Sequence, residues 1–381
     1  MTIDIFDISV TELCLAGALL LVFAYEVYFY IRYMRVRRKD RCADRAQSTE
    51  HRQPGVSVIV CARNEGDNLR HYVQSLLTQD YPEYEVIIVN DGSEDDTQAV
   101  IDDYMLTDSR VRTTFVPRGA RVRSTKKLGL TLAAKAAKYD YLLLTDADCR
   151  PESKHWISAM MAPFEDIAQS TEVVLGYGAY FCENTLLNSI IQYETLFNGL
   201  HYLGAAATGK PYMGVGRNLA YRKQMFFEHG GFSDQMKSFA GDDDLFVNKV
   251  ATRANTVSVY TPESITWSIP KKTWKDWWQQ KRRHLSVSPA YKPATKHHLV
   301  HEPVMRGLFY GLVIALFVLG EPLSMCLALA LLVARLIVQL VILNRSARKL
   351  GQPAIGLELM WYDLFQPLVT LAAMAGKKRT W

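Results

Sequence analysis

Hydrophobic positions divide the chain into a long apolar segment, a central region of short alternating runs, and a second apolar region. The first segment, Leu13–Tyr33, is long enough to cross a bilayer, because a membrane-spanning helix needs about 20 apolar residues. Two more spans are expected within residues 304–343, separated by the tight turn Gly320-Glu321-Pro322. The pattern therefore predicts membrane helices at both ends of a central domain.

Charged residues around these spans indicate on which side of the membrane the central domain lies. A basic run at 35–41 follows the first span, so residues 1–40 are expected to form a membrane helix with a basic flank, and the domain after it to lie in the cytoplasm. Arg345, Arg348 and Lys349 would return the chain to the same side. Glu26 is a charge inside the first span, and it either reaches toward the lipid headgroups or pairs with a later helix.

The last apolar stretch, residues 355–376, does not look like a simple crossing. It contains Glu358, Asp363 and Pro367, and a crossing would put the triplet Lys377-Lys378-Arg379 on the outer side. We therefore expect an interfacial or re-entrant helix pair there.

The central region alternates apolar runs with amphipathic segments. This pattern predicts an α/β domain with a parallel sheet covered by helices on both faces, and ligands of such sheets bind at the carboxyl ends of the strands. The expected strands are 56–60, 85–89, 111–116 and 141–144, and the expected helices are 68–79, 95–104 and 126–137.

The fourth strand ends in two carboxylates, Asp146 and Asp148. Two residues apart in an extended chain, they point to the same face, where their mutual repulsion calls for a cation or a hydrogen-bond network. Hard oxygen ligands suit Mg²⁺ or Mn²⁺, shared with a phosphate substrate. The alternative is that Asp148 caps a helix.

Other features narrow the class of protein. Asn90-Asp91-Gly92-Ser93 is a turn sequence that would also present Asp91 to a nucleoside. The first strand is followed by neither a Gly-x-Gly-x-x-Gly nor a P-loop motif, which disfavours dinucleotide oxidoreductases and P-loop NTPases. The six cysteines contain no Cys-x-x-Cys pair, which argues against a zinc module. The net charge of +5 owes much to the membrane flanks and does not imply a nucleic-acid partner.

Several motifs in series resemble the family-2 glycosyltransferases of the GT-A fold. The resemblance covers about residues 54–290, and it implies a mixed, mainly parallel sheet flanked by helices. In chain order the motifs are Ala62-Arg63-Asn64-Glu65, Asn90-Asp91-Gly92-Ser93, Lys126-Lys127, Asp146-Ala147-Asp148, Val215–Tyr221, Gly241-Asp242-Asp243-Asp244 and Gln279–His284.

The resemblance implies roles for individual residues. Asp91, with Ala62, Arg63, Asn64 and Glu65, would hold the nucleoside, expected to be uridine. Either Lys126 or Lys127 would approach the base or the diphosphate. Asp146 would contact the ribose and the metal, and Asp148 would be the direct metal ligand. Asp243 would be the general base with Asp242 in support, although three consecutive aspartates also suit a solvated loop or a helix N-terminus.

The last motif departs from the family's Gln-x-x-Arg-Trp. Either Gln279-x-x-Arg282-Arg283 or Gln280-x-x-Arg283-His284 can fill it, and we prefer the second because His284 offers a flat ring where Trp normally stacks. The absent Trp weakens an assignment to processive synthases. The expected contacts to the diphosphate or the acceptor are Asn218, Gln280, Arg282, Arg283 and His284.

The resemblance implies an inverting, metal-dependent transfer from a nucleotide sugar, expected to be a UDP-sugar. The acceptor would be a lipid, a lipid-linked sugar or a cell-envelope glycan at the cytoplasmic face of a bacterial inner membrane. A helix at 272–285 carrying Trp274, Trp277 and Trp278 would lie at the membrane surface, unless its tryptophans belong to the domain core. The alternatives are a processive polysaccharide synthase, a non-catalytic nucleotide-sugar-binding scaffold and, less favoured, a membrane nucleotidyltransferase.

Overall fold

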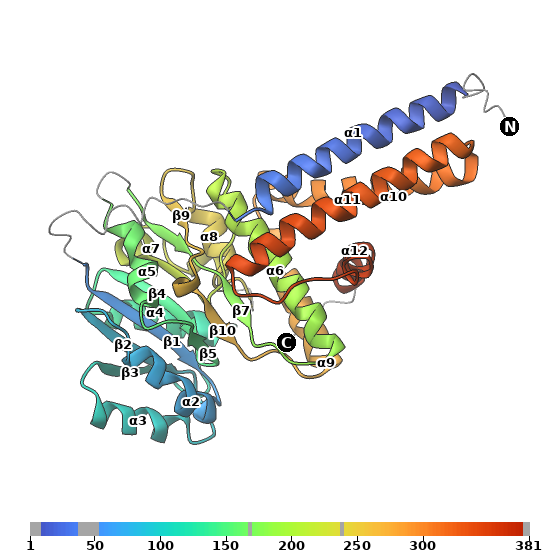
Figure 1. Cartoon of the computed structure of the whole chain (residues 1–381). Coiled ribbons are helices and arrows are strands. Elements are labelled where there is room, and N and C mark those ends of the chain that lie inside the picture. The colour runs from blue at the N-terminus through green and yellow to red at the C-terminus, as the bar shows by residue number, and fades with distance from the viewer. Residues whose placement is uncertain (1–8, 37–52, 167–169, 237–239, 376–381) are drawn as a thin grey trace.

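The computed structural model describes residues 9–36, 53–166, 170–236 and 240–375 of the chain. It has an α/β domain from which long helices project together in one direction (Figure 1). The basic residues at 37–41 and the triplet at 377–379, which informed the predicted orientation, lie outside the described residues.

The first half of the domain is the predicted parallel sheet. Strands β3 (Val111–Phe115), β2 (Tyr84–Asn90), β1 (Val56–Ala62) and β4 (Tyr141–Asp146) lie side by side in that order, and all their pairings are parallel. The connecting helices are α2 (Gly66–Leu77), α3 (Thr97–Thr107) and α4 (Thr125–Ala136), each within three residues of its predicted bounds. β1 and β2 are almost fully buried, as continuous apolar runs require.

The sheet continues beyond β4 with strands of mixed direction. β8 (Leu219–Arg222) is antiparallel to β4, and it is followed by β6 (Val173–Leu175) and β9 (Thr256–Ser258). The predicted mixed, mainly parallel sheet is therefore confirmed. The helices of this half are α5 (Trp156–Met161), α6 (Leu186–Ala207), α7 (Lys223–Glu228), α8 (Asp244–Val250) and α9 (Trp274–Leu285), with 3₁₀ turns at Ala162–Phe164, Ser233–Gln235, Pro262–Ser264 and Ser288–Ala290.

A small second sheet starts at the end of β4. Its strands are β5 (Cys149–Pro151), β10 (Thr266–Ser268) and β7 (Gly178–Tyr180). The interpretation of Asp148 as a helix cap is wrong, because the chain turns directly from β4 into β5.

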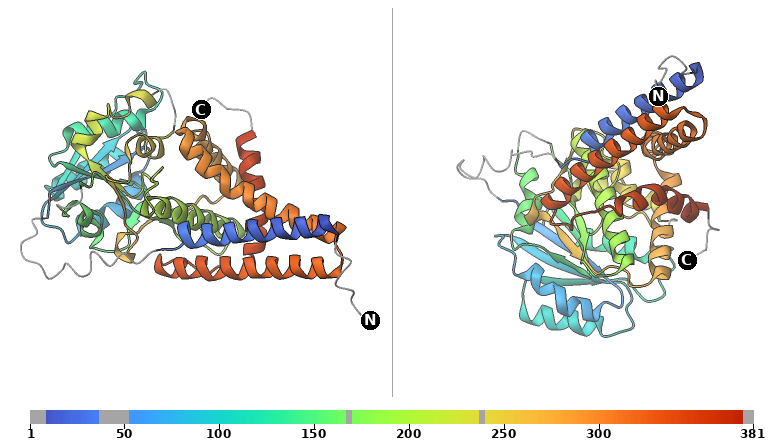
Figure 2. Two further views of the ribbon diagram at one scale, coloured as in Figure 1. Left: turned by 90° about the horizontal axis from the view of Figure 1, so that it is seen from above. Right: turned by 45° about the vertical axis from the view of Figure 1, so that its right-hand side comes forward.

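Three described helices are long and apolar enough to cross a membrane: α1 (Val10–Tyr33), α10 (Pro293–Leu319) and α11 (Pro322–Lys349). They run alongside one another away from the domain, whereas α12 (Leu359–Ala375) runs across them (Figure 2). Helix α10 begins eleven residues before the predicted bound of 304, because Pro293 starts a helical turn that continues into the apolar run.

The inner end of α1 is built into the domain core. Phe29, Tyr30 and Tyr33 pack in the same hydrophobic cluster as the buried face of α6. At Gly204 of α6, an added Cβ would lie 1.9 Å from the carbonyl oxygen of Tyr33, so only glycine permits this close approach. Glu26, the charge inside α1, pairs with Arg335 of α11, which decides between the two interpretations in favour of a helix partner.

Candidate active site

The loops after β1 and β2 are joined by hydrogen bonds at the carboxyl end of the sheet. The backbone N–H of Asn64 donates to Ser93 Oγ at 3.0 Å, and the N–H of Glu94 donates to Asn64 Oδ1 at 2.8 Å. The N–H of Glu65 donates to Thr97 Oγ1 at 2.9 Å. Asn64 has φ of +56°, a left-handed conformation that asparagine tolerates better than most residues. The two predicted nucleoside-binding segments therefore form one surface.

Asp91 lies at the centre of this surface with one oxygen in use and one free. Its backbone N–H donates to the carbonyl oxygen of Ala62 at 2.8 Å, and its Oδ2 accepts the Thr125 hydroxyl at 2.8 Å. Oδ1 is buried and has no hydrogen-bond partner among the described residues. Burial raises the pKa of Asp91, while the neighbouring Arg63 charge lowers it. A buried acceptor without a partner is uncommon, and it suits an N–H or O–H group of a ligand.

The two adjacent lysines of α4 have different partners. Lys126 Nζ lies 3.1 Å from Asp146 Oδ1 and 3.1 Å from Asp242 Oδ2, so it joins the two acidic motifs. Lys127 is fully buried, and its Nζ donates to the carbonyl oxygens of Gln235 at 2.9 Å and Ala240 at 2.7 Å. Of the two lysines that the sequence left open, Lys126 reaches the acidic groups at the strand ends, whereas Lys127 holds the loop before Asp242.

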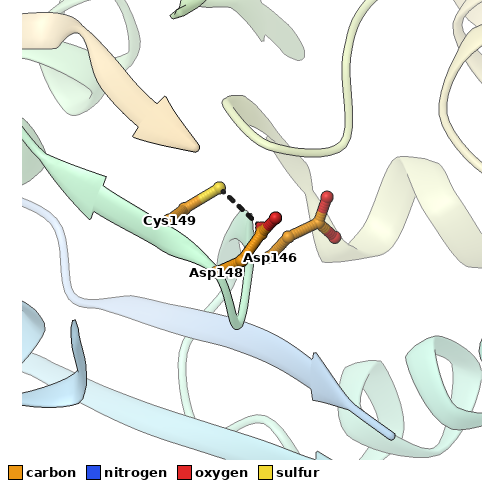
Figure 3. Close-up of side chains that lie close together, drawn as sticks. All are labelled: Asp146, Asp148 and Cys149. Carbon is orange, nitrogen blue, oxygen red and sulfur yellow. Dashed lines mark hydrogen bonds between the residues drawn. The ribbon is translucent and has the colours of Figure 1, made fainter. Parts of the chain in front are cut away.

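Asp146 and Asp148 meet where β4 turns into β5, next to Cys149 (Figure 3). Ligand atoms of the three residues lie within 4.8 Å of one another. The Cys149 thiol contacts Ser268 Oγ at 2.9 Å, and burial raises its pKa, so it remains protonated. Burial and the charge of Asp146 raise the pKa of Asp148, and the charge of Arg217 offsets this rise only in part. Two carboxylates this close together fit a hard divalent cation such as Mg²⁺ or Mn²⁺.

The second acidic motif opens α8. Asp243 caps the helix: its Oδ1 accepts the N–H of Asp244 at 2.8 Å, and its Oδ2 accepts the N–H of Gly216 at 2.7 Å. Burial opposes ionisation of Asp242, but Lys126 lowers its pKa overall, whereas burial and the charge of Asp242 raise the pKa of Asp243. The pKa of Asp242 is thus lowered and that of Asp243 raised, a difference that suits Asp243 as the general base and Asp242 as its support. Asp243, the candidate base, is therefore also the residue that caps the N-terminus of α8.

Asn218 does not lie where the sequence placed it. The prediction that it contacts the diphosphate or the acceptor is wrong, because its side chain is fully buried. Its Oδ1 accepts Trp156 Nε1–H at 3.0 Å, and its Nδ2 donates to the carbonyl oxygens of Tyr177 at 2.9 Å and Ser264 at 2.6 Å. Asn218 thus connects α5, the residue before β7 and the 3₁₀ turn at Pro262–Ser264.

The neighbouring Arg217 is the residue that sequence reasoning missed. Its guanidinium stacks 4.1 Å from the Tyr180 ring centroid and donates to the carbonyl oxygen of Gly178 at 3.0 Å. Its charge acts on Asp148, whose pKa it lowers against the effects of burial and Asp146. The motif Val215–Tyr221 contains both residues, but Arg217 and Asn218 lie in the turn before β8, where the sequence does not indicate which side chain faces the site.

A cavity of about 250 Å³ lies beside Arg217, between β7, α6, α9 and α12. Gln280 and His284 of α9 line it, and Gln280 Nε2 donates to the Tyr180 hydroxyl at 3.1 Å. The surrounding protein atoms, followed by the charges of Arg283 and Arg217, lower the pKa of His284, although its side chain remains exposed. The remaining lining residues are Tyr177, Gly178, Tyr180, Ile191, Glu194, Thr195, Asn198, Gly199, Tyr202, Met213, Val215, Trp277, Lys281, Leu285, Gln366 and Thr370.

Helix α9 has one face toward the domain and another toward solvent. Trp277 is buried against Leu187 and Ile191 of α6, while Trp274 is 51% exposed. Trp277 therefore belongs to the core, Trp278 packs against the same cluster, and a place at the membrane surface stays a prediction for Trp274. Arg282 and Arg283, both predicted contacts, do not line the cavity.

Comparison with known proteins gives the family. Residues 57–231 match the model of glycosyl transferase family 2, and residues 146–342 match that of glycosyl transferase family group 2. The chain is 26% identical over 233 residues to a probable glycosyltransferase, YdaM, of Bacillus subtilis (strain 168), covering 60% of this chain and 54% of that protein. It is 32% identical over 126 residues to a poly-β-1,6-N-acetyl-D-glucosamine synthase of Staphylococcus epidermidis, covering 32% of this chain and 29% of that protein.

The chain thus matches about half the length of the first relative and less than a third of the second. Among solved structures, the mannosyltransferase PcManGT from Pyrobaculum calidifontis in complex with GDP-Man and Mn²⁺ superposes with a TM-score of 0.54 and 17% identity, over 94% of this chain and 99% of that one. This likeness confirms the predicted GT-A fold. The two family matches, which together extend from residue 57 to residue 342, make the chain a member of glycosyltransferase family 2.

Proposed function

We propose that this protein is an inverting, metal-dependent glycosyltransferase that moves a sugar from a nucleotide sugar to a hydroxyl acceptor at the cytoplasmic face of a bacterial inner membrane. The observation that carries the proposal is the arrangement of three kinds of carboxyl group along one edge of the sheet. They are the unpartnered oxygen of Asp91, the pair Asp146 and Asp148, and the helix-capping Asp243.

The donor would bind across the ends of β1, β2 and β4. Asp91 Oδ1 would accept an N–H of the base, such as N3–H of the expected uridine, and Arg63 and Lys126 would face the anionic part of the nucleotide. Asp148 and Asp146 would hold the divalent metal, which supplies positive charge to the departing diphosphate.

The acceptor hydroxyl would attack the anomeric carbon from the side of Asp243. The new bond from the acceptor oxygen to that carbon forms as the bond to the diphosphate oxygen breaks, and Asp243 takes the hydroxyl proton. Each oxygen of Asp243 accepts one backbone N–H, so lone pairs remain for this proton. One displacement of this kind inverts the anomeric configuration and needs no covalent intermediate.

The cavity beside Arg217 is the best candidate for the acceptor site. Aromatic faces and uncharged polar groups line it, which is the combination that sugar rings require, and the charges of Glu194 and Lys281 pair with each other. Its α12 wall leads toward the three long helices. A lipid-linked or cell-envelope glycan fits such a cavity better than a soluble metabolite does.

The test is a screen of radiolabelled nucleotide sugars, UDP-linked and GDP-linked, with membranes containing the wild-type protein or Asp243→Asn. We expect one donor to label a membrane-bound product, chelation to abolish the labelling, and Mn²⁺ or Mg²⁺ to restore it. Transfer that survives chelation would remove the role given to Asp148. Equal labelling with Asp243→Asn would remove the proposed base, and no labelling with any donor would favour a non-catalytic scaffold.

A processive polysaccharide synthase is the second candidate. The 32% identity to a poly-β-1,6-N-acetyl-D-glucosamine synthase favours it, although the match covers only 126 residues. Product length separates the two: single transfer gives a product one sugar longer than the acceptor, and a synthase gives a polymer at early times.

A further inference from the structure

A buried carboxylate, Asp363, fastens α12 to the long helices. Its Oδ2 accepts Arg335 Nη1–H at 2.5 Å and the Tyr310 hydroxyl at 2.7 Å, and its Oδ1 accepts Gln339 Nε2–H at 3.0 Å. Asp363 is fully buried, and Arg335 is 3% exposed. All the hydrogen-bonding partners named here come from α10 and α11, so this one side chain joins three helices.

Arg306 of α10 makes a second connection to α12. It pairs with Glu302 one turn earlier, and its Nη1 donates to the carbonyl oxygen of Asp363 at 3.0 Å and to Gln366 Oε1 at 3.2 Å. Its guanidinium also lies 5.2 Å from the ring centroid of Phe197 in α6. Through this arginine, α10 contacts both α12 and the domain.

With Glu26 of α1 on Arg335, the network contains five charged side chains from four helices. At 1.5 Å rise per residue, Arg306 and Arg335 each lie about 20 Å from the far ends of their helices, inside a hydrocarbon layer of about 30 Å. Burying charges there is costly, and apolar residues often stabilise a bundle as well or better. Such a network instead fixes the position of each helix along its neighbours, because a helix that shifted along the bundle would leave a buried charge without its partner.

The position of α12 in the bundle decides which of its side chains face the candidate acceptor cavity. Gln366 and Thr370, four residues apart on one face of α12, line the cavity. Because Gln366 Oε1 accepts from Arg306, the amide orientation is fixed, and its Nε2 has no hydrogen-bond partner in the described part of the chain. Two N–H donors are therefore available at the membrane side of the cavity.

We propose that this network holds α12 so that Gln366 forms the membrane-side wall of the acceptor site and donates to an oxygen of the acceptor sugar. Arg306 and Asp363 are then positioning residues, and Gln366 determines acceptor specificity. This inference rests on the proposed function, and it concerns the acceptor alone: the donor-binding groups lie at the strand ends of the sheet, on other elements.

The experiment compares purified variants in lipid nanodiscs, using the donor that gives label in the screen. The acceptor probes are the chloroform–methanol extract and the water-soluble glycan fraction of host membranes, and donor hydrolysis without acceptor is measured separately. Gln366→Leu should raise the acceptor KM at least tenfold, with the donor KM and the hydrolysis rate unchanged. Arg306→Met should do the same, and Arg306→Lys should recover part of the loss. Leu368→Ala, an exposed position on α12, is the matched control and should behave as wild type.

A wild-type acceptor KM for Gln366→Leu would overturn the inference, as would a parallel loss of donor binding and hydrolysis. If wild-type protein turns over no donor at all, the proposed function fails and the positioning claim is tested without turnover. Trp278 of α9 and Val369 of α12 pack on one cluster, so cysteines placed there should be joined by a short thiol cross-linker. Arg306→Met should reduce that yield while Leu368→Ala should not, and equal yields would overturn the positioning role.

Discussion

Asp91 gives the sharpest test of the donor site, because its two oxygens have separate partners. Oδ2 accepts the Thr125 hydroxyl at 2.8 Å, and Oδ1 is buried without a partner among the described residues. We expect Oδ1 to accept the ring N–H of uracil. Asp91→Asn keeps the shape and can still present one oxygen, whereas Asp91→Leu removes the acceptor altogether.

The two substitutions should weaken UDP binding to different extents. A hydrogen bond to an ionised acceptor contributes about 1.5–3 kcal/mol, and one to a neutral acceptor about 0.5–1.5 kcal/mol. Asp91→Asn should therefore cost about 1 kcal/mol, roughly a fivefold rise in the Kd for UDP. Asp91→Leu should lose the whole interaction, a rise of about 10- to 150-fold. Thr125→Val, which leaves Oδ1 in place, is the matched control and should change the Kd least.

Titration calorimetry measures these Kd values, with UDP and with UDP methylated on the ring nitrogen as the two ligands. Wild-type protein should discriminate between the two ligands, and Asp91→Leu should not. Because burial raises the pKa of Asp91, UDP affinity should fall as the pH drops through that raised value, while Asp91→Asn stays flat. If Asp91→Leu still discriminates between the ligands, Asp91 does not contact the base.

Four other expectations follow from the site. Asp243→Asn should keep UDP binding and lower kcat by about 10²- to 10⁴-fold, checked by turnover at saturating donor. Asp148→Asn should raise the metal concentration needed for half-maximal turnover; an unchanged metal titration would contradict its role. Asn218→Ala leaves three buried groups without their hydrogen-bond partner. It should therefore lower the free energy of unfolding of the domain by about 3 kcal/mol or more, without changing the UDP Kd of the folded protein. Burial and Asp243 raise the pKa of Asp244 from 3.8 to about 8, so folding stability should decline as the pH rises between these values, and Asp244→Asn should remove that decline in thermal melts.

The sequence predicted the sheet and its strand-end motifs well, because both depend on local patterns. Continuous apolar runs of β1, β2 and β4 indicate buried parallel strands, and the carboxyl ends of such strands meet at one edge. Asp91 and Asp146 could therefore be assigned to one edge before any contact was known. The same argument could not separate Lys126 from Lys127, because Asp242, a partner of Lys126, and the carbonyl groups that hold Lys127 lie more than a hundred residues further along the chain.

Residues 355–376 and the motif around Asn218 show where local patterns fail. The sequence predicted an interfacial or re-entrant helix pair because Glu358, Asp363 and Pro367 interrupt the apolar stretch, whereas the structure has the single helix α12 with Pro367 inside it. The partner that compensates Asp363 is Arg335, which lies in another helix. Arg217 and Asn218 lie in the turn just before β8, where the backbone N–H of Asn218 donates to the carbonyl oxygen of Val215 at 2.9 Å. The alternation of side chains along a strand does not extend to a turn, so only the tertiary packing decides which of the two side chains faces the site.

Helix α10 connects the candidate base to the candidate acceptor wall. Tyr291, just before this helix, donates to Asp244 Oδ2 at 2.9 Å, and Thr295 Oγ1 accepts from Asn248 Nδ2 at 2.9 Å, so the start of α10 is fixed to α8, which Asp243 caps. About 17 Å further along the same helix, Arg306 holds Gln366. Bonded at both points, and with Pro303 inside the helix between them, α10 would link the position of the proposed base to that of the proposed acceptor wall. Attack geometry would then be set by α10, and the bilayer would need only to hold the helix.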